Sequence, residues 1–505
     1  MNLRGWIQRW RRLREYCRQL EKENAQLKGE NAQLKERNAW LEARLRESEA
    51  RNRRLSESLA AAKKDSSTSS KPPSSDIVKA SAKELGKKKR PKRKPGGQKG
   101  HPKHEHVPFA PEQVDERTEH RLHVCPVDAS HRIRPAEDRT RTLQQVELAP
   151  KPIWITEHTA YGIWCHDCHG YHDAPFPPAL TRAGLFGPRL TALVCYAKAR
   201  LHGSYSGIRD FLEATLETKV SRGYLVKLLD KARRAFNAPY DELVGCLAQQ
   251  PVLNIDETGH KENGLRYWTW CFRAATFAVF KIARSRGTEV LEHMLGEGFK
   301  GLLGCDYYAA YRKYARECSV LVQFCLAHLI REVKYLCDFP DPQVQRYGQG
   351  LLKGIQALFH TLHRKGQLTP QTLAGELAAA QEQIWEAAMA PKAFPGRFGG
   401  LKPHRLIANL MRRFQKHGQA YFQFITNPEI DPTNNIVERA LRFVVMDRHM
   451  TQGTRSERGR TICERLWTVM TTCAIQKRSP FEWMCQAISA WVQARPVPSL
   501  LADSS

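Results

Sequence analysis

Two aspartates in the middle of the chain are placed where acids can hold metal ions. Asp256 follows the apolar run Val252–Ile255, and Asp306 follows the run Gly301–Cys305. Each run is predicted to be a strand that ends at its aspartate. Two like charges repel, and a fold rarely places them together unless a cation neutralises them. Neighbouring carboxylates therefore indicate two divalent ions, about 4 Å apart, that activate the attacking oxygen and stabilise the leaving oxygen in phosphoryl transfer.

The segment DPTNNIVERALR, residues 431–442, supplies a third acid, Glu438. Its Pro-Thr-Asn beginning is typical of a helix start, so Glu438 and Arg442 are predicted to share one helix face. Arg442 could then reach a substrate phosphate or hold Glu438 in place, and Arg439 is a further candidate for DNA contact. Such carboxylates suit Mg²⁺, or Mn²⁺, with two ions per site. Taken singly, each acid is an ordinary strand-end, turn or helix-surface residue.

The elements around the two aspartates follow the order that would make them neighbours. Segments Tyr267–Arg273 and Phe277–Ala283 alternate like paired strands, a helix precedes the Asp306 strand, and a helix and the strand Val320–Phe324 follow it. Three antiparallel strands followed by alternating helix and strand predict an RNase H-like fold. In that fold the first and fourth strands run side by side at the sheet centre, so acids at their ends would meet.

This catalytic core is predicted in two parts, residues 251–340 and 426–505. Residues 341–425 contain amphipathic stretches such as LAGELAAAQEQIWEAAM, which predict a helical insertion. After Glu438, the run DRHMTQGTRSERGR is rich in arginine and suits a loop that grips the DNA backbone. The alternative is a solvated connector to the last helices, Thr461–Gln476 and Pro480–Val492.

The N-terminal segment, residues 1–63, carries a seven-residue repeat of leucine. A parallel two-stranded coiled coil needs this apolar seam, and asparagines at the matching positions specify an in-register pair. The predicted dimerisation residues are Leu20, Asn24, Leu27, Asn31, Leu34, Asn38 and Leu41. All flanking pairs are opposite in sign, namely Glu23–Lys28, Glu30–Lys35, Arg37–Glu42 and Arg44–Glu49. The alternative is a single solvated amphipathic helix.

Residues 64–106 form a linker rich in Ser, Pro, Gly and Lys, a composition that buries too little apolar area to offset chain entropy. Its densest cationic patch is predicted to contact DNA phosphates and comprises Lys87, Lys88, Lys89, Arg90, Lys92, Arg93 and Lys94. The alternatives are a solubilising tether and, in a eukaryotic chain, a nuclear import signal. A basic-zipper transcription factor is rejected, because its basic helix precedes the zipper, whereas this run follows it and is broken by prolines.

Residues 107–180 resemble a zinc ribbon with one knuckle incomplete. Tetrahedral zinc takes four sulfur or nitrogen ligands, commonly from two Cys-x-x-Cys pairs. Cys165 and Cys168 form one pair, whereas Cys125 is followed three residues later by Asp128. Asp128, His131 or His123 could complete a structural Zn²⁺ site. The alternative is a ribbon that has lost its metal.

Residues 181–250 have a helical pattern. The segments YSGIRDFLEATL and VSRGYLVKLLDKARRAF, joined by a short turn, suggest a helix-turn-helix, with Ser221 capping the second helix. Arg222, Tyr224 and Lys227 would lie near its start, where contacts to bases or phosphates are made. A plain helical hairpin is the alternative.

The bulk composition agrees with a nucleic-acid partner. Lys and Arg number 80 against 52 Asp and Glu, a net charge of +28, which favours a polyanion. We see no apolar run long enough to span a bilayer and no signal peptide, so we expect no membrane contact, a cytoplasmic location and free thiols. The expected fold is a multidomain α+β chain with an N-terminal parallel coiled coil, a zinc-ribbon-like unit, a helical DNA-binding region and an RNase H-like α/β catalytic domain.

Several motifs resemble transposases of the insertion-sequence-66 family, and they cover nearly the whole chain in order. They are SSKPPSSD at 69–76, PGGQKGH at 95–101, DETG at 256–259, GCDYYAAY at 304–311, CLAHLIR at 325–331 and NNIVERALR at 434–442. The resemblance implies a bacterial mobile-element transposase of the DDE type, in which Asp256, Asp306 and Glu438 bind two metal ions. Water would cut DNA at an element end, and the freed 3′-OH would attack target DNA.

The resemblance also implies partners and a domain plan. Partners would be double-stranded DNA at element ends and target, a second copy of the chain or a higher assembly, and accessory proteins of the same element. The long interval between Asp306 and Glu438 fits an RNase H-like domain that carries an insertion. Cys325 and His328 match a motif inside that interval; with no second pair evident, we interpret them as structural. Asp128 departs from the family pattern.

Two other functions stay open. One is a DNA-binding dimer, repressor-like or domesticated, whose catalytic centre is not used. The other is a nuclease with the same metal chemistry and no strand transfer. The three intact acids favour the transposase.

Overall fold

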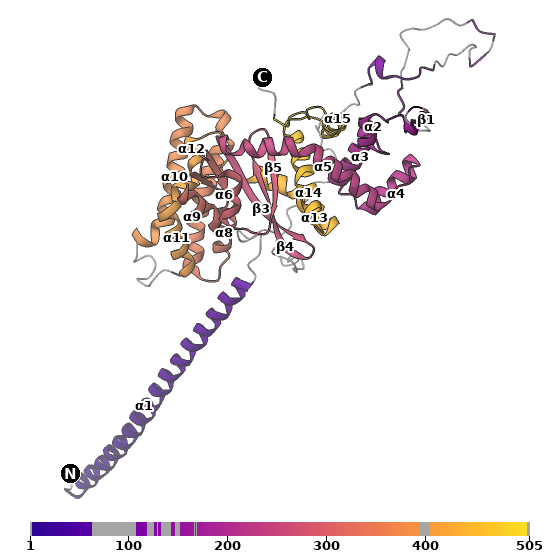
Figure 1. Cartoon of the computed structure of the whole chain (residues 1–505). Helices are drawn as coiled ribbons and strands as arrows, with labels where there is room; N and C mark the ends of the chain where they lie inside the picture. Colours follow the sequence, from indigo (N-terminus) through magenta and orange to yellow (C-terminus); the bar gives the residue numbers. More distant parts are fainter. Residues whose placement is uncertain are drawn as a thin grey trace. The chain divides into compact units, whose positions relative to one another are not determined.

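The computed structural model describes residues 3–62, 108–118, 126–128, 130–132, 143–146, 152–165, 167, 169–393 and 404–501 (Figure 1). The chain is a mixed α+β protein. It divides into two compact units, one of residues 1–78, 176–209 and 220–505, the other of residues 79–175 and 210–219. Within the described segments, no helix combines the length and the apolar character that a bilayer crossing requires.

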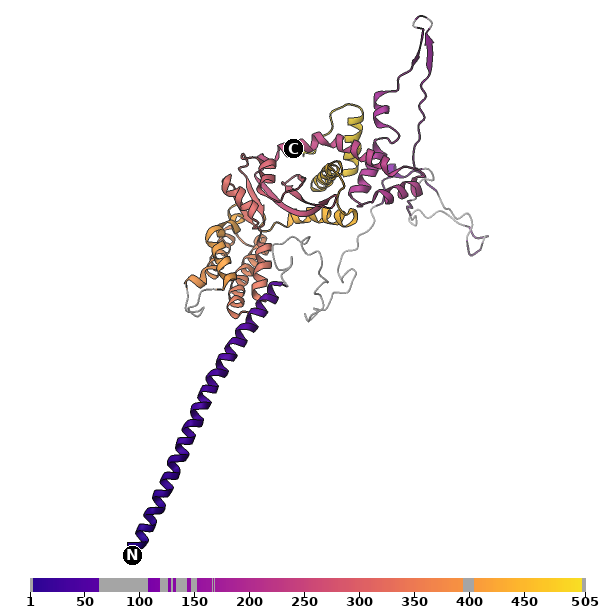
Figure 2. The ribbon, with the colours of Figure 1, turned by 60° about the horizontal axis from the view of Figure 1, so that its bottom comes forward.

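The predicted N-terminal helix is present as α1 (Leu3–Ala62), one unbroken helix of 60 residues (Figure 2). Its predicted seam is exposed on the single chain, with Leu27 at 55% and Leu34 at 57% of full exposure. An apolar stripe of this length is stable in water when it packs against a partner. Pairing with a second copy stays a prediction.

The sheet has five strands in the order β5-β4-β3-β6-β7. The antiparallel strands are β3 (Val252–Glu262), β4 (Leu265–Arg273) and β5 (Ala278–Ala283); β6 (Leu302–Cys305) and β7 (Leu321–Phe324) continue from β3 in parallel. The predicted neighbourhood of the first and fourth strands, β3 and β6, is confirmed.

One strand boundary was predicted wrongly, because β3 does not end at Asp256. Asn263 and Gly264 both have positive φ angles, 48° and 81°, which is the geometry of a two-residue hairpin turn. This turn pairs residues 254–262 of β3 with β4 and prolongs the strand to Glu262. The parallel pairing with β6 stops at Asn254, so Asp256 lies where β3 and β6 part.

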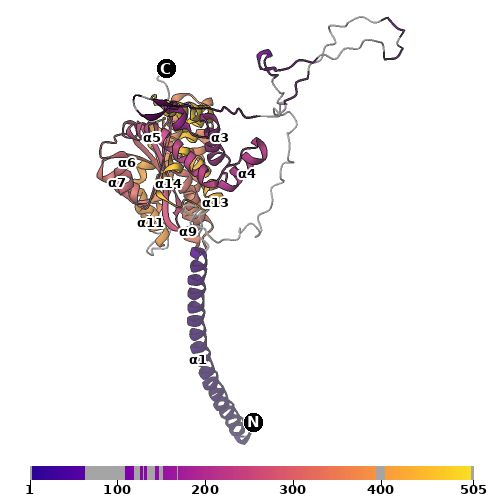
Figure 3. The same ribbon diagram turned by 45° about the vertical axis from the view of Figure 1, so that its right-hand side comes forward.

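Helices cover both faces of the sheet (Figure 3). On one face α13 (Asn435–Thr451) and α14 (Glu457–Ile475) bury a cluster of Cys271, Ala278, Phe280, Ile282, Val437, Leu441, Val444 and Trp467. The other face carries α6 (Thr288–Leu295) and α7 (Ala309–Glu317), where the rings of Trp270 and Tyr311 lie 6.0 Å apart. Each face of the sheet is therefore covered by its own helices, and a strand residue points to one layer or the other.

The outer edge of β5 is satisfied by side chains of α14. Glu464, Thr468 and Thr472 are one helical turn apart, and they accept the N–H groups of Ile282 (2.8 Å), Phe280 (3.1 Å) and Ala278 (3.2 Å). All three side chains are fully buried. An unpaired strand edge is costly when water cannot reach it, so this ladder fixes α14 along the sheet.

Two short strands and the other α-helices come before and after the five-stranded sheet in the sequence. Ahead of the sheet lie β1 (Gly162–Cys165), β2 (Gly170–Asp173), α2 (Pro178–Ala183), α3 (Pro188–Ala199), α4 (Tyr205–Leu216) and α5 (Arg222–Gly245). After β7 come α8 (Leu326–Cys337), α9 (Pro342–His363), α10 (Pro370–Ala393), α11 (Arg405–His417) and α12 (Gln423–Thr426), in the interval predicted to be a helical insertion. The last helix is α15 (Pro480–Val492), with the predicted bounds.

Candidate active site

The parallel pairing of β3 with β6 brings Asp256 and Asp306 to the same level of the sheet. Asn254 lies opposite Gly304, and each aspartate follows two residues later. Residues two apart on a strand point to the same face. Asp256 lies opposite Cys271 of β4, which belongs to the cluster beneath α13. Asp256 therefore lies on the face that α13 covers, and Asp306 follows the last residue of β6 at the same level of the sheet.

Burial of these acids makes their charges costly. Burial, and then the charges of Glu257, Asp306 and Glu438, raise the pKa of Asp256 well above its ordinary value. Burial and Glu257 also raise the pKa of Asp306, from 3.8 to about 7. Each carboxylate accepts one backbone N–H, from Glu257 (2.9 Å) and Tyr308 (2.8 Å) respectively. Crowded buried carboxylates of this kind fit a divalent cation, which would remove the repulsion.

Glu438 lies in the first turn of α13 with its carboxylate held by other groups. Its Oε1 is 3.4 Å from a guanidinium nitrogen of Arg331 and 3.7 Å from Nδ1 of His328. Burial raises the pKa of Glu438, and the charges of Arg331 and Arg442 oppose that rise. The charge of Glu438 reaches Asp256, yet the predicted trio is not a compact ligand set. Across the described part of the chain, the group with three metal-ligand atoms within 4.8 Å is Cys325, His328 and Glu438.

A buried amide, which the sequence reasoning treated only as a helix start, positions α13 over the strands. Asn434 precedes α13 but does not cap it; its side chain turns to the sheet. Its Oδ1 accepts from Nδ2 of Asn254 (2.8 Å), and its Nδ2 donates to the carbonyl of Ile255 (2.9 Å). Its backbone N–H donates to Sγ of Cys325 (3.1 Å). The sequence offered one sign of this contact: the polar residue Asn254 stands in an otherwise apolar strand and needs a hydrogen-bond partner there.

A fourth acid, Glu257, was also missed. It is 2% exposed and lies on the opposite face from Asp256, since neighbouring strand residues alternate. Arg286 donates to its carboxylate through Nε at 2.7 Å and Nη2 at 2.6 Å, and the Tyr311 hydroxyl donates to it as well. Glu257 is thus fully paired, and its charge acts on both aspartates through the sheet.

The predicted arginine-rich loop is largely helix, which corrects the prediction. Helix α13 continues to Thr451 and α14 begins at Glu457, so the connector is only residues 452–456. Arg448 donates to the Thr258 hydroxyl (3.2 Å) and to the carbonyl of Gly259, which anchors α13 to β3. Arginines that appeared free for DNA are partly used inside the fold.

Other predicted residues have the following places. Arg439 and Arg442 are exposed on α13; Arg222 and Lys227 are exposed near the start of α5. Ser221 caps α5 as predicted, accepting the N–H of Tyr224 at 3.1 Å. The Tyr224 hydroxyl accepts the N–H of Phe186 at 3.2 Å, so this tyrosine supports the fold.

Some predictions lie outside the described residues. They concern the linker patch, residues 87–94, together with Cys125, Cys168 and His123. Cys165 ends β1, and its side chain is not among those described. Asp128 accepts the N–H of Ser130 at 2.8 Å, as a turn residue does. Structural Zn²⁺ at Cys125, Cys165 and Cys168 stays a prediction.

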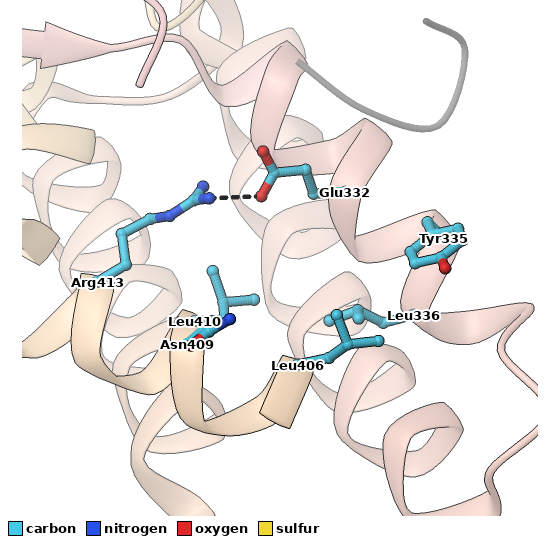
Figure 4. Close-up of a pocket in the computed structure, with 7 residues that line it drawn as sticks. All are labelled: Glu332, Tyr335, Leu336, Leu406, Asn409, Leu410 and Arg413. Carbon is cyan, nitrogen blue, oxygen red and sulfur yellow. Dashed lines mark ion pairs between the residues drawn. The ribbon is translucent and has the colours of Figure 1, made fainter. Parts of the chain in front are cut away.

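A cavity of about 160 Å³ lies between α8 and α11 (Figure 4). It is lined by Glu332, Tyr335, Leu336, Leu406, Asn409, Leu410 and Arg413. Glu332 and Arg413 point toward one another across it, with 2.7 Å between the ion-pair atoms. None of the three predicted acids is in this lining, so we assign the cavity to helix packing.

Comparison with known proteins shows the family of the chain. The family model described as "Transposase IS66 family" matches residues 183–462, more than half of the chain, so the chain belongs to the IS66 family of transposases. A model of a family of unknown function matches residues 10–107. Two relatives are uncharacterized proteins of Sinorhizobium fredii. Protein y4hP is 24% identical over 396 residues, 72% of this chain and 69% of that protein; y4qI is 22% identical over 453 residues, 82% and 78% respectively.

Gly304 allows the Asn254–Asn434 contact, and this can be tested. A methyl group at Gly304 would lie 2.3 Å from Nδ2 of Asn254. We expect Gly304→Ala to lower the free energy of unfolding by about 1–3 kcal/mol, because the displaced amides lose buried hydrogen bonds. Chemical denaturation measures this. Gly298→Ala, where the added methyl meets open space, is the control. Equal stability of the two variants would contradict the proposed close fit.

The raised pKa of Asp306 predicts how stability depends on pH and metal. The folded state favours the protonated carboxyl, so its contribution is complete below 3.8 and is lost as pH rises through about 7. The melting temperature of the metal-free protein should therefore fall between about pH 5 and about pH 8. Mg²⁺ should restore it at the upper end, because the ion binds the folded carboxylates.

Two variants sharpen this measurement. Asp306→Asn should weaken both the pH dependence and the Mg²⁺ effect, whereas Asp431→Asn, at an exposed acid ahead of α13, should keep both. If Mg²⁺ left the melting temperature of the wild type unchanged near pH 8, Asp256 and Asp306 would not bind the ion.

Proposed function

We propose that this chain is a DDE transposase that binds the ends of its insertion element and catalyses metal-dependent DNA cleavage and strand transfer. The observation that carries the proposal is the parallel pairing of β3 with β6, which brings Asp256 and Asp306 to the same level of the sheet. Glu438 enters from α13 itself. Membership of the IS66 family supports the same function.

The order of the strands supports an RNase H-like catalytic domain. Three antiparallel strands are followed by two parallel ones, and the first strand is central. Helices α8–α12 then separate β7 from α13, as an insertion in this domain would.

The acids fit a site for two Mg²⁺ or Mn²⁺ ions. When bound, such ions polarise the phosphate and favour the attacking and leaving oxygens. Asp256 on β3 and Asp306, directly after β6, would supply carboxylate oxygens, and their mutual repulsion favours binding of a cation. Glu438 would complete the set if its side chain left Arg331 and turned toward Asp256. Exposed Arg439 and Arg442 on the same helix are placed to contact the phosphate backbone.

DNA binding follows from charge. The net charge of +28 suits phosphate contact with release of counterions, so affinity should fall steeply with salt. Exposed Arg222 and Lys227 on α5 are candidate contacts, together with the linker patch.

Catalysis can be tested with purified full-length protein, labelled element ends, a target plasmid and Mg²⁺. Asp256→Asn, Asp306→Asn and Glu438→Gln should each lower strand transfer by roughly a thousand-fold or more, since each removes a metal-binding carboxylate. Asp431→Asn is the matched control.

The products separate the candidate functions. Joined products support the transposase, cleavage alone supports a nuclease, and shifted but uncut DNA supports a binding dimer with an unused centre. Unchanged strand transfer in Asp256→Asn would show that the acid assignment is wrong.

The exposed seam of α1 supports pairing of two copies through a parallel coiled coil. In the full-length protein, Leu27→Asp combined with Leu34→Asp should halve the mass of the sedimenting particle, because charges in the seam separate the dimer into single chains. The control is Gln26→Asp with Gln33→Asp, which adds equal charge one position before each leucine, off the seam. A charged-seam variant that still sediments as a dimer would exclude α1 as the dimer contact.

A further inference from the structure

Three side chains with the chemistry of a transition-metal site converge at Glu438, whose charge also acts on Asp256. Cys325 directly precedes α8, His328 lies in the first turn of α8, and Glu438 lies in the first turn of α13. One ligand atom from each, Sγ, Nδ1 and a carboxylate oxygen, lies within 4.8 Å of the other two. Nδ1 of His328 and Oε1 of Glu438 are 3.7 Å apart. Zinc–ligand bonds of roughly 2.0–2.3 Å would bring these two ligand atoms only slightly closer together than 3.7 Å.

The histidine nitrogen of this cluster has no hydrogen bond. His328 is 9% exposed, and its Nδ1 is buried without a hydrogen-bond partner. Leaving a buried polar atom unsatisfied is costly, so such an atom needs an explanation. An ion between His328, Cys325 and Glu438 would satisfy it.

The sulfur of Cys325 is prepared for the same role. Cys325 is 2% exposed, and its Sγ accepts the backbone N–H of Asn434 at 3.1 Å. This backbone N–H orients the sulfur and opposes the rise in the pKa of Cys325 that burial causes, as outer hydrogen bonds support metal ligands. The sulfur also lies at the start of α8, where the helix dipole favours negative charge.

This donor set selects a different ion from the aspartates. Thiolate and imidazole favour borderline ions such as Zn²⁺ or Co²⁺, whereas Mg²⁺ prefers oxygen ligands alone. Three protein ligands leave the fourth tetrahedral position open for water or a phosphate oxygen.

We propose that Cys325, His328 and Glu438 bind one Zn²⁺-class ion, and that this ion holds Glu438 away from Asp256 and Asp306. On binding, the S–H bond of Cys325 breaks, its proton passes to solvent and a sulfur–metal bond forms. The thiolate and the carboxylate together balance the two positive charges, so neighbouring Arg331 faces a neutral site. The inhibitory consequence rests on the proposed function, since it requires that Glu438 act in catalysis; the binding does not.

Binding is tested on the full-length protein with Co²⁺ and a phosphine reductant. The wild type should show thiolate-to-cobalt charge-transfer absorption and bind one ion more than Cys325→Ser, and Zn²⁺ should displace that ion. His328→Ala, as a second variant, should lower the affinity for the same ion by roughly ten-fold or more. Cys337→Ser, at the other end of α8, is the matched control, and circular dichroism checks that each variant is folded. Equal cobalt stoichiometry in folded wild type and folded Cys325→Ser would overturn the proposal.

Inhibition is tested by adding Zn²⁺ to Mg²⁺-dependent strand transfer, with each variant compared to its own zinc-free rate. Half-inhibition should need roughly ten-fold more Zn²⁺ or greater in Cys325→Ser than in Cys337→Ser. Equal sensitivity of the two variants would overturn the inhibitory role. If wild type binds more cobalt than Cys325→Ser, but neither the wild type nor any variant joins DNA, the proposed function fails and the metal site stands. If the acids prove catalytic and no cobalt difference appears, the metal site alone fails.

Discussion

The buried side chain of Asn434 is the constraint on which the geometry of the site depends. It is 1% exposed, and its amide bonds to Asn254 and to the carbonyl of Ile255 while its N–H reaches Cys325. A buried amide must satisfy both its donors and its acceptor, so it tolerates only a narrow range of positions. The start of α13 is therefore fixed over β3 and α8, and Glu438, one turn later, is placed with it.

The same helix is also held at its other end. Thr454 donates its N–H to the carbonyl of Lys261 (2.9 Å), and its own carbonyl accepts the N–H of Asn263 (2.8 Å). Gly453 permits this approach, because a Cβ there would lie 2.2 Å from the carbonyl oxygen of Lys261. With the ladder from α14 along β5, these contacts bind the last part of the chain to the sheet. The position of Glu438 relative to the sheet is therefore well defined, although a long interval of sequence separates it from Asp306.

Sequence reasoning predicted the strands and the neighbourhood of the two strands that lead to Asp256 and Asp306, because periodicity is local. The runs before Asp256 and Asp306 are apolar, and parallel neighbours bring such positions together whatever the rest of the chain does. The Asn263-Gly264 dipeptide is a local signal of a hairpin turn that was missed, and this turn lengthens β3. Distant contacts were missed as well: the hydrogen bond of Arg448 to Thr258 and the ion pair of Arg460 with Glu262 use these arginines inside the fold. The roles of Asn254 and Asn434 depend on a hydrogen bond that no spacing reveals.

Two sets of neighbours therefore compete for the carboxylate of Glu438. Arg331 and His328 hold it on the α8 side, while its charge also contributes to the raised pKa of Asp256. Because Asn434 and Thr454 fix the backbone of α13 at both ends, we expect exchange between the two sets to occur by rotation about the side-chain bonds of Glu438. Such rotation costs far less than moving a packed helix. Which set prevails is then decided by the cation present, a hard ion near the aspartates or a borderline ion near Cys325.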